Sequence, residues 1–166
     1  MAVKYLDAKR IQGSSIGAST SSTVNSGTGQ NDSTDGSINI LAQRFQTGHT
    51  LIGKAIRTFT VNIKKVGTPT GTITARIINS SNVEQAAFGT LDIATLTTSS
   101  VATTFTNSTN EYLLVDGDRI ALYYSGGTAL DWQMATTTNS NTNGSYYTGS
   151  WTERNRDANM SVTSIS

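Results

Sequence analysis

The sequence predicts an all-β protein, built as a sandwich or barrel of short antiparallel strands. Small uncharged polar residues dominate, since 28 Thr, 20 Ser and 13 Asn account for 61 of the 166 residues. The chain also contains 15 Gly and one Pro, a composition typical of strands joined by many turns. Apolar and polar residues alternate in roughly eight to ten short segments, and no long helical repeat occurs.

The composition argues against several classes of function. Lys and Arg number 12 against 11 Asp and Glu, and charged residues make up 14% of the chain, so a basic nucleic-acid-binding surface is not expected. The chain has no Cys and a single histidine, His49, which lies in a turn-like segment where a solvated loop residue is expected rather than a general base. We therefore expect no enzymatic activity.

Membrane insertion and secretion are not expected either. No segment approaches the roughly 20 apolar residues that a membrane-spanning helix needs. The first ten residues carry charges throughout and lack the apolar stretch of a secretory signal.

The first 37 residues differ in kind from residues 38–166, which we expect to form the sandwich domain. Between Gly13 and Ser37 only Ile16 and Val24 are large and apolar, too few to offset the entropy of ordering the segment. We interpret residues 14–37 as a flexible linker or a strand-like arm that orders only against a partner. The first ten residues are either an anchor or an N-terminal strand of the domain. The apolar residues expected to dock the arm in an assembly are Val3, Tyr5, Leu6 and Ile11.

From residue 38 onward, period-two alternation predicts the strands in order. They are expected around Ile38, Ile40, Ala42 and Phe45; Phe59, Val61 and Ile63; Ile73, Ala75 and Ile77; Phe88, Leu91 and Ile93; Val101, Thr103 and Phe105; Leu130, Trp132 and Met134; and, after Trp151, Met160 and Val162. The only proline lies in the turn between Val66 and Gly71, which predicts a hairpin or a sharp corner. Residues 82–87 are the one place where a helix of at most one or two turns is expected.

The strongest local pattern spans Tyr112 to Tyr124. Two apolar runs flank Asp116 and Gly117, and an Asp-Gly pair between apolar runs is typical of a tight hairpin turn. We expect a strand, a tight turn and a second strand.

The region from Phe59 to Ser161 resembles a loose family of jelly-roll β-sandwich modules in virion-associated, extracellular and carbohydrate-binding proteins. The resemblance follows the order of a Gly-Thr-Pro-Thr-Gly corner, the segment from Leu114 to Leu122, a tryptophan strand at Trp132 and a Tyr-Gly loop ending near Trp151. It implies a jelly-roll sandwich, and it supports the fold better than the function.

The first residues suggest a viral origin. Lys4 to Gly13 resembles the opening of structural proteins of marine phages and archaeal viruses. This resemblance implies a virion surface or tail protein with the leader as a docking segment. Neutral polar strands suit an extracellular particle, and release by lysis would need no export signal.

A cluster of aromatic residues near the C-terminus predicts a glycan site. Tyr146, Tyr147, Trp151 and Trp132 lie close in sequence, and sugar recognition uses aromatic faces beside polar groups. Trp132 alternates with Leu130, however, so we expect its side chain to lie in the core.

No cofactor or metal site is expected. Asp116 and Asp118 could contribute to a Ca²⁺ site, but their spacing matches no complete calcium loop, and turn-forming aspartates explain them better.

The leading hypothesis is a non-enzymatic structural protein of a virion (capsid decoration, tail or fibre) or a similar extracellular assembly. It would self-associate through its N-terminal arm and contact other assembly proteins. The alternative is a carbohydrate-binding or adhesion module that recognises host glycans through loop aromatics.

Overall fold

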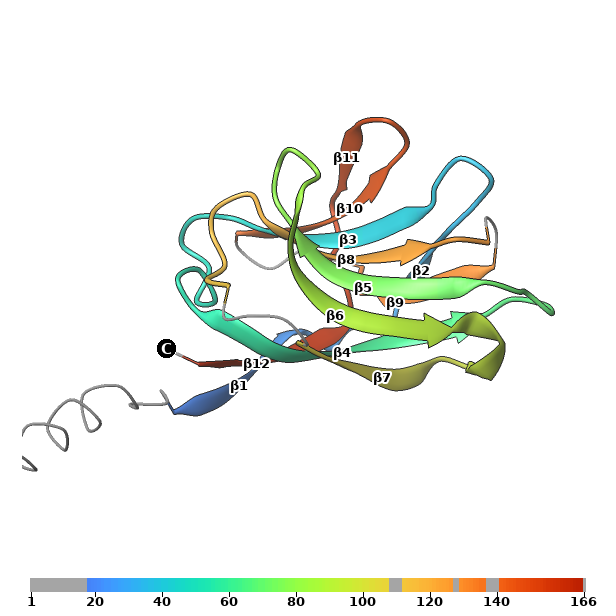
Figure 1. The fold of residues 1–166 in the computed structure, drawn as a ribbon, viewed down its shortest axis with the longest axis horizontal. Coiled ribbons are helices and arrows are strands. Elements are labelled where there is room, and N and C mark those ends of the chain that lie inside the picture. The colour runs from blue at the N-terminus through green and yellow to red at the C-terminus, as the bar shows by residue number, and fades with distance from the viewer. Residues whose placement is uncertain (1–17, 108–111, 127–128, 137–140, 166) are drawn as a thin grey trace, which may run out of the picture.

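The computed structural model describes residues 18–107, 112–126, 129–136 and 141–165, which form two six-stranded antiparallel sheets packed face to face (Figure 1). The first sheet contains β1 (Ser19–Asn25), β2 (Gln30–Ser33), β4 (Ala55–Lys65), β7 (Val101–Thr106), β9 (Leu130–Met134) and β12 (Met160–Ile165). The second contains β3 (Ile40–Phe45), β5 (Thr72–Ile78), β6 (Glu84–Asp92), β8 (Arg119–Tyr124), β10 (Thr142–Tyr147) and β11 (Trp151–Arg154). A short 3-10 helix, η1 (Ile93–Thr95), follows β6. The arm residues Val3, Tyr5, Leu6 and Ile11 lie outside the described residues.

The strand order confirms the predicted β-sandwich and its jelly-roll character. Strands β2 to β9 are distributed as β2-β9-β4-β7 in one sheet and β3-β8-β5-β6 in the other, the arrangement of an eight-stranded jelly roll. The remaining strands extend this core. Strands β10 and β11 continue the second sheet beyond β3, while β12 and β1 add to the first sheet along β4.

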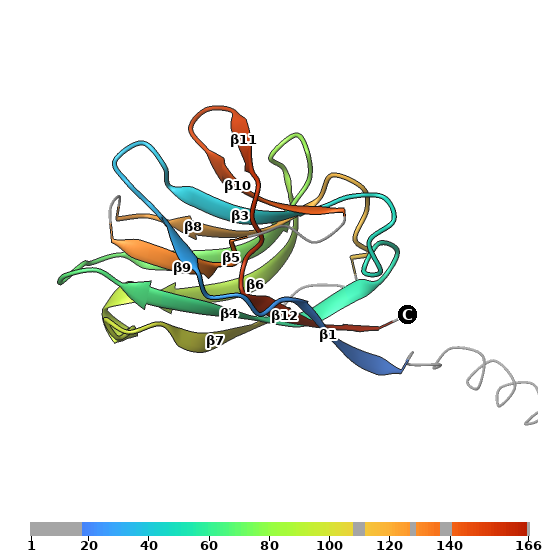
Figure 2. The same ribbon diagram turned by 180° about the vertical axis from the view of Figure 1, so that it is seen from behind.

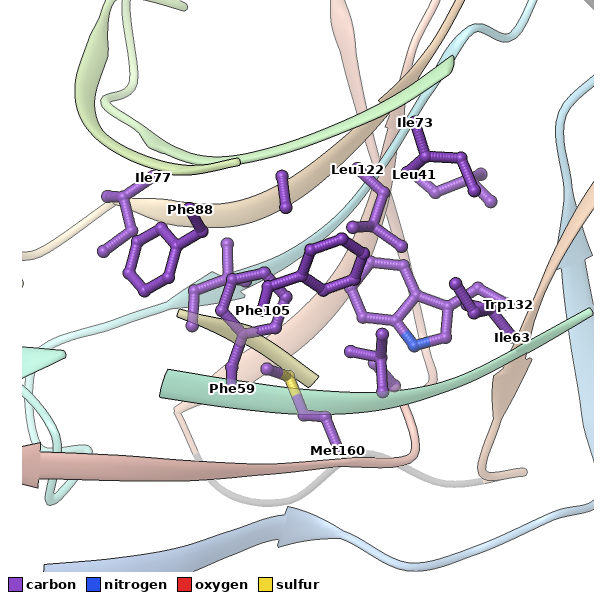
Figure 3. Close-up of a cluster of buried hydrophobic side chains, with 14 of the residues drawn as sticks. Leu41, Phe59, Ile63, Ile73, Ile77, Phe88, Phe105, Leu122, Trp132 and Met160 are labelled. Atoms are coloured by element: carbon purple, nitrogen blue, oxygen red, sulfur yellow. The ribbon is translucent and has the colours of Figure 1, made fainter. Parts of the chain in front are cut away.

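The core lies between the sheets, where the period-two alternation places it. Phe59, Val61 and Ile63 on β4 are fully buried, and so are Ile73 and Ile77 on β5. Aromatic rings from several strands meet there (Figure 3). Burying each such side chain contributes about 1.5–3 kcal/mol. The sandwich is therefore held together chiefly by residues that the sequence pattern identified.

Residues 19–25 and 30–33 form strands of the first sheet, which differs from the expectation that residues 14–37 are a flexible linker or an arm that orders only against a partner. Strand β1 pairs with β12, and β2 pairs with β9. Val24 is 3% exposed and belongs to the core cluster. An added strand needs few apolar side chains because its backbone hydrogen bonds join it to a formed sheet, and composition does not reveal this. The boundary at residue 38 is thus not the start of the sandwich.

The expected short helix at residues 82–87 is wrong, because the chain there enters β6. The Asn79 side chain accepts hydrogen bonds from the backbone N–H of Ser81 and Val83, and Asn82 adopts a positive φ of 63°. These features make a tight turn. Strand β6 then pairs with β5 along its length, so the segment forms the second arm of a hairpin.

The turn at Asp116 and Gly117 exists, but it does not join a hairpin. Gly117 has a φ of 85°, and the Asp118 N–H donates to the Val115 carbonyl, as expected of a tight turn. The Gly117 N–H donates to the Phe45 carbonyl, which holds the turn against the end of β3. Before the turn, the only pairing among the described residues is a single bridge between Leu113 and Ala55. Tertiary contacts therefore override the local hairpin pattern.

Candidate binding surfaces

The structure separates the four aromatic residues predicted to form a glycan site. Trp132 is 0% exposed and lies between the sheets (Figure 3), so it confirms the expectation of a core residue and has no access to a ligand. Tyr146 and Tyr147 are neighbours on β10 and point to opposite faces of the sheet. Trp151 on β11 pairs with Tyr147. The surface site therefore reduces to Tyr147 and Trp151.

Tyr147 and Trp151 form part of an aromatic face on the outer side of the second sheet. Their ring centroids lie 5.2 Å apart with the planes tilted by 58°. Tyr123 on β8 belongs to the same cluster, and all three rings are half-buried. We use "aromatic face" for Tyr123, Tyr147 and Trp151. The three rings pack on four buried apolar residues, Ile40, Ala42, Ile78 and Ala121. The β10–β11 hairpin that carries two of the rings rises above the sheet (Figure 2).

Arginine side chains accompany the aromatic face. The Arg119 guanidinium lies 4.3 Å from the centroid of the Trp151 ring, and its Nη2 donates to Glu153 at 2.6 Å. Burial lowers the pKa of Arg119, and the hydrogen bond to Glu153 opposes this shift. Arg76 stacks on Tyr123 at 5.3 Å. Cation–π contacts of this kind contribute about 0.5–2 kcal/mol and fix the ring orientation.

The aromatic face combines apolar and polar groups that could contact a ligand. Half-exposed rings offer an apolar surface, and the neighbouring guanidinium and carboxylate groups offer hydrogen-bond donors and acceptors. Glu153 is engaged by both Arg119 and Arg44, the latter at 3.5 Å. The sequence could not identify the arginines, because Arg119, Arg76 and Arg44 are far from the β10–β11 hairpin along the chain and only the sheet brings them near it.

Asp116 and Asp118 shape their turn, as expected. The Asp116 Oδ1 accepts a hydrogen bond from the Thr47 N–H at 2.6 Å, which lowers the pKa of Asp116. The Asp118 Oδ2 accepts from the Val115 N–H at 2.8 Å, while burial raises the pKa of Asp118. Within the described ranges, no group of three or more His, Cys, Asp or Glu side chains is placed to hold a metal ion.

His49 occupies a half-buried position in the β3–β4 connection. Its Nδ1 accepts a hydrogen bond from the Leu51 N–H at 3.2 Å, and its ring makes an edge contact with Phe45 at 5.1 Å. Burial lowers the pKa of His49. The His49 side chain is more buried than the solvated loop residue that the sequence suggested. Its contacts with Leu51 and Phe45 give it a role in packing the β3–β4 connection.

A second surface, on the outer side of the first sheet, was not identified from the sequence. Strand register aligns two neighbouring rows of hydroxyl side chains across four adjacent strands, and we call these residues the hydroxyl face. They are Ser21, Thr23, Thr58, Thr60, Thr104, Thr106, Ser161 and Thr163. Each strand contributes two hydroxyl residues in a hydroxyl-x-hydroxyl pattern, but long-range register is needed to align them. Thr60 and Thr104 are joined by a hydrogen bond of 2.8 Å between their Oγ1 atoms.

A hollow of about 390 Å³ lies at the end of β2 and β9, lined by Ser33, Thr34, Val66, Ala129 and Asp131. Its one charged lining residue, Asp131, accepts a hydrogen bond from the Ser33 hydroxyl at 2.6 Å and pairs with Lys64 at 3.4 Å. The carboxylate is thus already engaged by the protein.

Comparisons with protein-family models, with curated proteins and with solved structures find no match to this chain. No helix in the described part of the chain is long and apolar enough to cross a membrane.

Proposed function

We propose that the protein is a non-enzymatic structural subunit of a virion or a similar extracellular assembly, and that it self-associates through its N-terminal segment. The observation that carries the proposal is β1. This strand lies at an edge of the first sheet, directly after residues 1–17, and contains neither a charged residue nor proline. Unguarded edge strands can pair with another chain, and proteins that stay monomeric usually protect them.

The sequence around β1 supports the same conclusion. Residues 11–31 contain no charged side chain, whereas Lys4, Asp7, Lys9 and Arg10 precede them. A neutral segment approaches a second copy without like-charge repulsion. The apolar residues of the leader would then contact a neighbouring subunit, as the resemblance of Lys4 to Gly13 to viral structural proteins implies.

A truncation tests the proposal. Because β1 begins at Ser19, removing residues 2–17 leaves every described strand in place. We expect light scattering and electron microscopy to show oligomers larger than a dimer for the full chain. The truncated chain, which keeps β1, should form no oligomer larger than a dimer. An unchanged size after truncation would remove the role of the leader. A full chain that stays at 17.6 kDa at every concentration would contradict self-association altogether.

The aromatic face supports a second candidate function, carbohydrate binding or adhesion. The supporting observation is the half-exposed pair of Tyr147 and Trp151 next to Arg119 and Glu153. A glycan array measures this directly, with and without Ca²⁺. We expect Trp151→Ala to weaken binding by about tenfold, which corresponds to about 1.4 kcal/mol.

Tyr146→Phe is the control, because Tyr146 lies on β10 next to Tyr147 and faces the other side of the sheet. It should bind as the wild type does. Absence of binding to every glycan, or equal binding by the Trp151→Ala variant, would exclude the aromatic face as a saccharide site.

A further inference from the structure

We infer that two copies of this chain join through β1, pairing antiparallel about a two-fold axis perpendicular to the first sheet. The partner is a second copy of the same chain, and the product is one sheet continuous across both copies. This inference rests on the self-association in the proposed function, and it names the strand that makes the contact.

The other edge strands of the sandwich are protected or covered. Strand β11 is four residues long and carries Glu153 and Arg154. Strand β2 is equally short, and its Asp32 forms ion pairs with Arg154 of β11 and with Arg156, which follows β11. Strand β6 carries Glu84 and Asp92, and its register with β5 is interrupted twice. Such charges and irregularities discourage pairing with another chain.

Two edge strands lack charge, and their positions differ. Strand β7 contacts β6 of the opposite sheet, at the closed side of the sandwich (Figure 1). Strand β1 has β12 on one side, and no described strand lies on its other side. In both ribbon views β1 projects beyond the body of the sandwich (Figures 1 and 2). The most accessible uncharged edge is therefore that of β1.

The sequence of β1 is compatible with pairing to itself. An antiparallel pair centred on Ser21 places Ser21 beside Ser21 of the second copy, Thr20 beside Ser22, and Ser19 beside Thr23. Every pair is then hydroxyl to hydroxyl. The first sheet already contains such a pair in Thr60 and Thr104, with their oxygens 2.8 Å apart. Hydroxyl pairs across strands are favourable, whereas like charges in these positions would not be.

In an antiparallel pair, the start of β1 in one copy lies beside the end of β1 in the other. A two-fold pair is also the commonest form of homo-oligomer.

The chain has no cysteine, so single introduced cysteines report the contact without background. Opposed residues in adjacent strands have Cβ atoms about 4.5–5.5 Å apart, close to the separation in a disulfide. Under mild oxidation we expect Ser21→Cys in the full chain to form a covalent pair in most molecules. Thr104→Cys, an exposed hydroxyl position on the opposite edge strand β7, is the matched control and should remain unlinked.

Lysine substitutions test the same edge without a covalent bond. The double variant S21K/T23K places two positive charges on β1, at exposed positions where they should not disturb the fold. We expect pairing to weaken at least tenfold, measured by sedimentation equilibrium. T104K/T106K adds the same charges to β7 and should leave pairing unchanged. Circular dichroism on both variants checks that the sandwich is intact.

The outcomes separate this inference from the proposed function. If the wild type associates while S21K/T23K pairs as tightly as it does, the β1 contact is wrong and self-association stands. Cross-linking of Thr104→Cys in place of Ser21→Cys would overturn the inference in favour of β7. A wild type that remains at 17.6 kDa at all concentrations would overturn both proposals.

Discussion

Replacing Gln43 by methionine removes an amide that joins three parts of the sandwich. Gln43 on β3 is 0% exposed and faces the core. Its Nε2 donates to the Asp157 Oδ1 at 2.7 Å, and its Oε1 accepts from the Ala158 N–H at 2.6 Å. Thr142 on β10 donates to the other carboxylate oxygen of Asp157 at 3.0 Å. Methionine fills a similar volume and makes none of these bonds.

The expected loss in the free energy of unfolding comes from the Ala158 N–H and the Asp157 carboxylate, which lose their hydrogen-bond partner in the variant. A buried N–H without an acceptor costs about 1–3 kcal/mol, and a buried carboxylate that loses a donor costs more. Together they predict a loss of about 3–5 kcal/mol, similar to the cost of removing one partner of a buried ion pair, because the Asp157 carboxylate is also a buried group that has lost a donor. For a chain of this size, each kcal/mol lowers Tm by about 2–4 °C, so the midpoint should fall by about 6–20 °C.

Urea unfolding followed by tryptophan fluorescence measures this loss. The matched control is Gln133→Met on β9, because the Gln133 side chain is only partly buried. Its Oε1 accepts a hydrogen bond from the Asn159 side chain at 3.3 Å. The control should cost less than about 1 kcal/mol. If Gln43→Met also costs less than about 1 kcal/mol, the buried network does not hold β3, β10 and the chain before β12 together.

Four further variants test the packing of the fold and the pH dependence of its stability. Gly144→Ala should cost about 1–3 kcal/mol in urea unfolding, because its Cβ would lie 2.8 Å from the Arg156 carbonyl oxygen. Gly36→Ala, with no atom within 4 Å of its Cβ, should be neutral, and equal costs would contradict this packing. Trp132→Ala should cost about 3–5 kcal/mol, and a smaller loss would show that the core closes around the gap. Burial lowers the pKa of His49 in the folded state, so the unfolded chain binds more protons and stability falls as pH drops through about 6.5. A pH series of unfolding free energies should show that fall in the wild type and a smaller one in His49→Gln, whereas identical curves would refute the assignment.

The sequence predicts the central strands well because period-two alternation is a local property. Phe59, Val61 and Ile63 alternate with polar residues, and each is buried as the pattern requires. The same argument placed Trp132 in the core correctly. A residue's face is set by its parity within a strand, which the sequence contains directly.

The edge strands could not be predicted in this way. The partners of Ser21 and Thr23 are Thr163 and Ser161, which lie nearly a full chain length away. Residues 19–25 contain one large apolar side chain, Val24, so composition alone indicated disorder. Their place in the sheet depends on backbone hydrogen bonds to β12, and no local pattern records those.

The aromatic face was predictable in part. Tyr147 and Trp151 lie close together in sequence, and the hairpin between them brings their rings into contact. Arg119 and Tyr123 come from β8, which the fold places alongside β3, so their contribution depends on strand order. Strand order is a long-range property, and it determined which of the predicted aromatic residues share a surface.

Amide hydrogen exchange of β1 tests the central claim most directly. Alternate backbone N–H groups of an edge strand face solvent, and pairing with a second copy protects them. Exchange at residues 19–23 should slow markedly as protein concentration rises, while exchange in the buried strand β4 should not change. Rapid exchange in β1 at every concentration would contradict the claim that this edge carries the self-association.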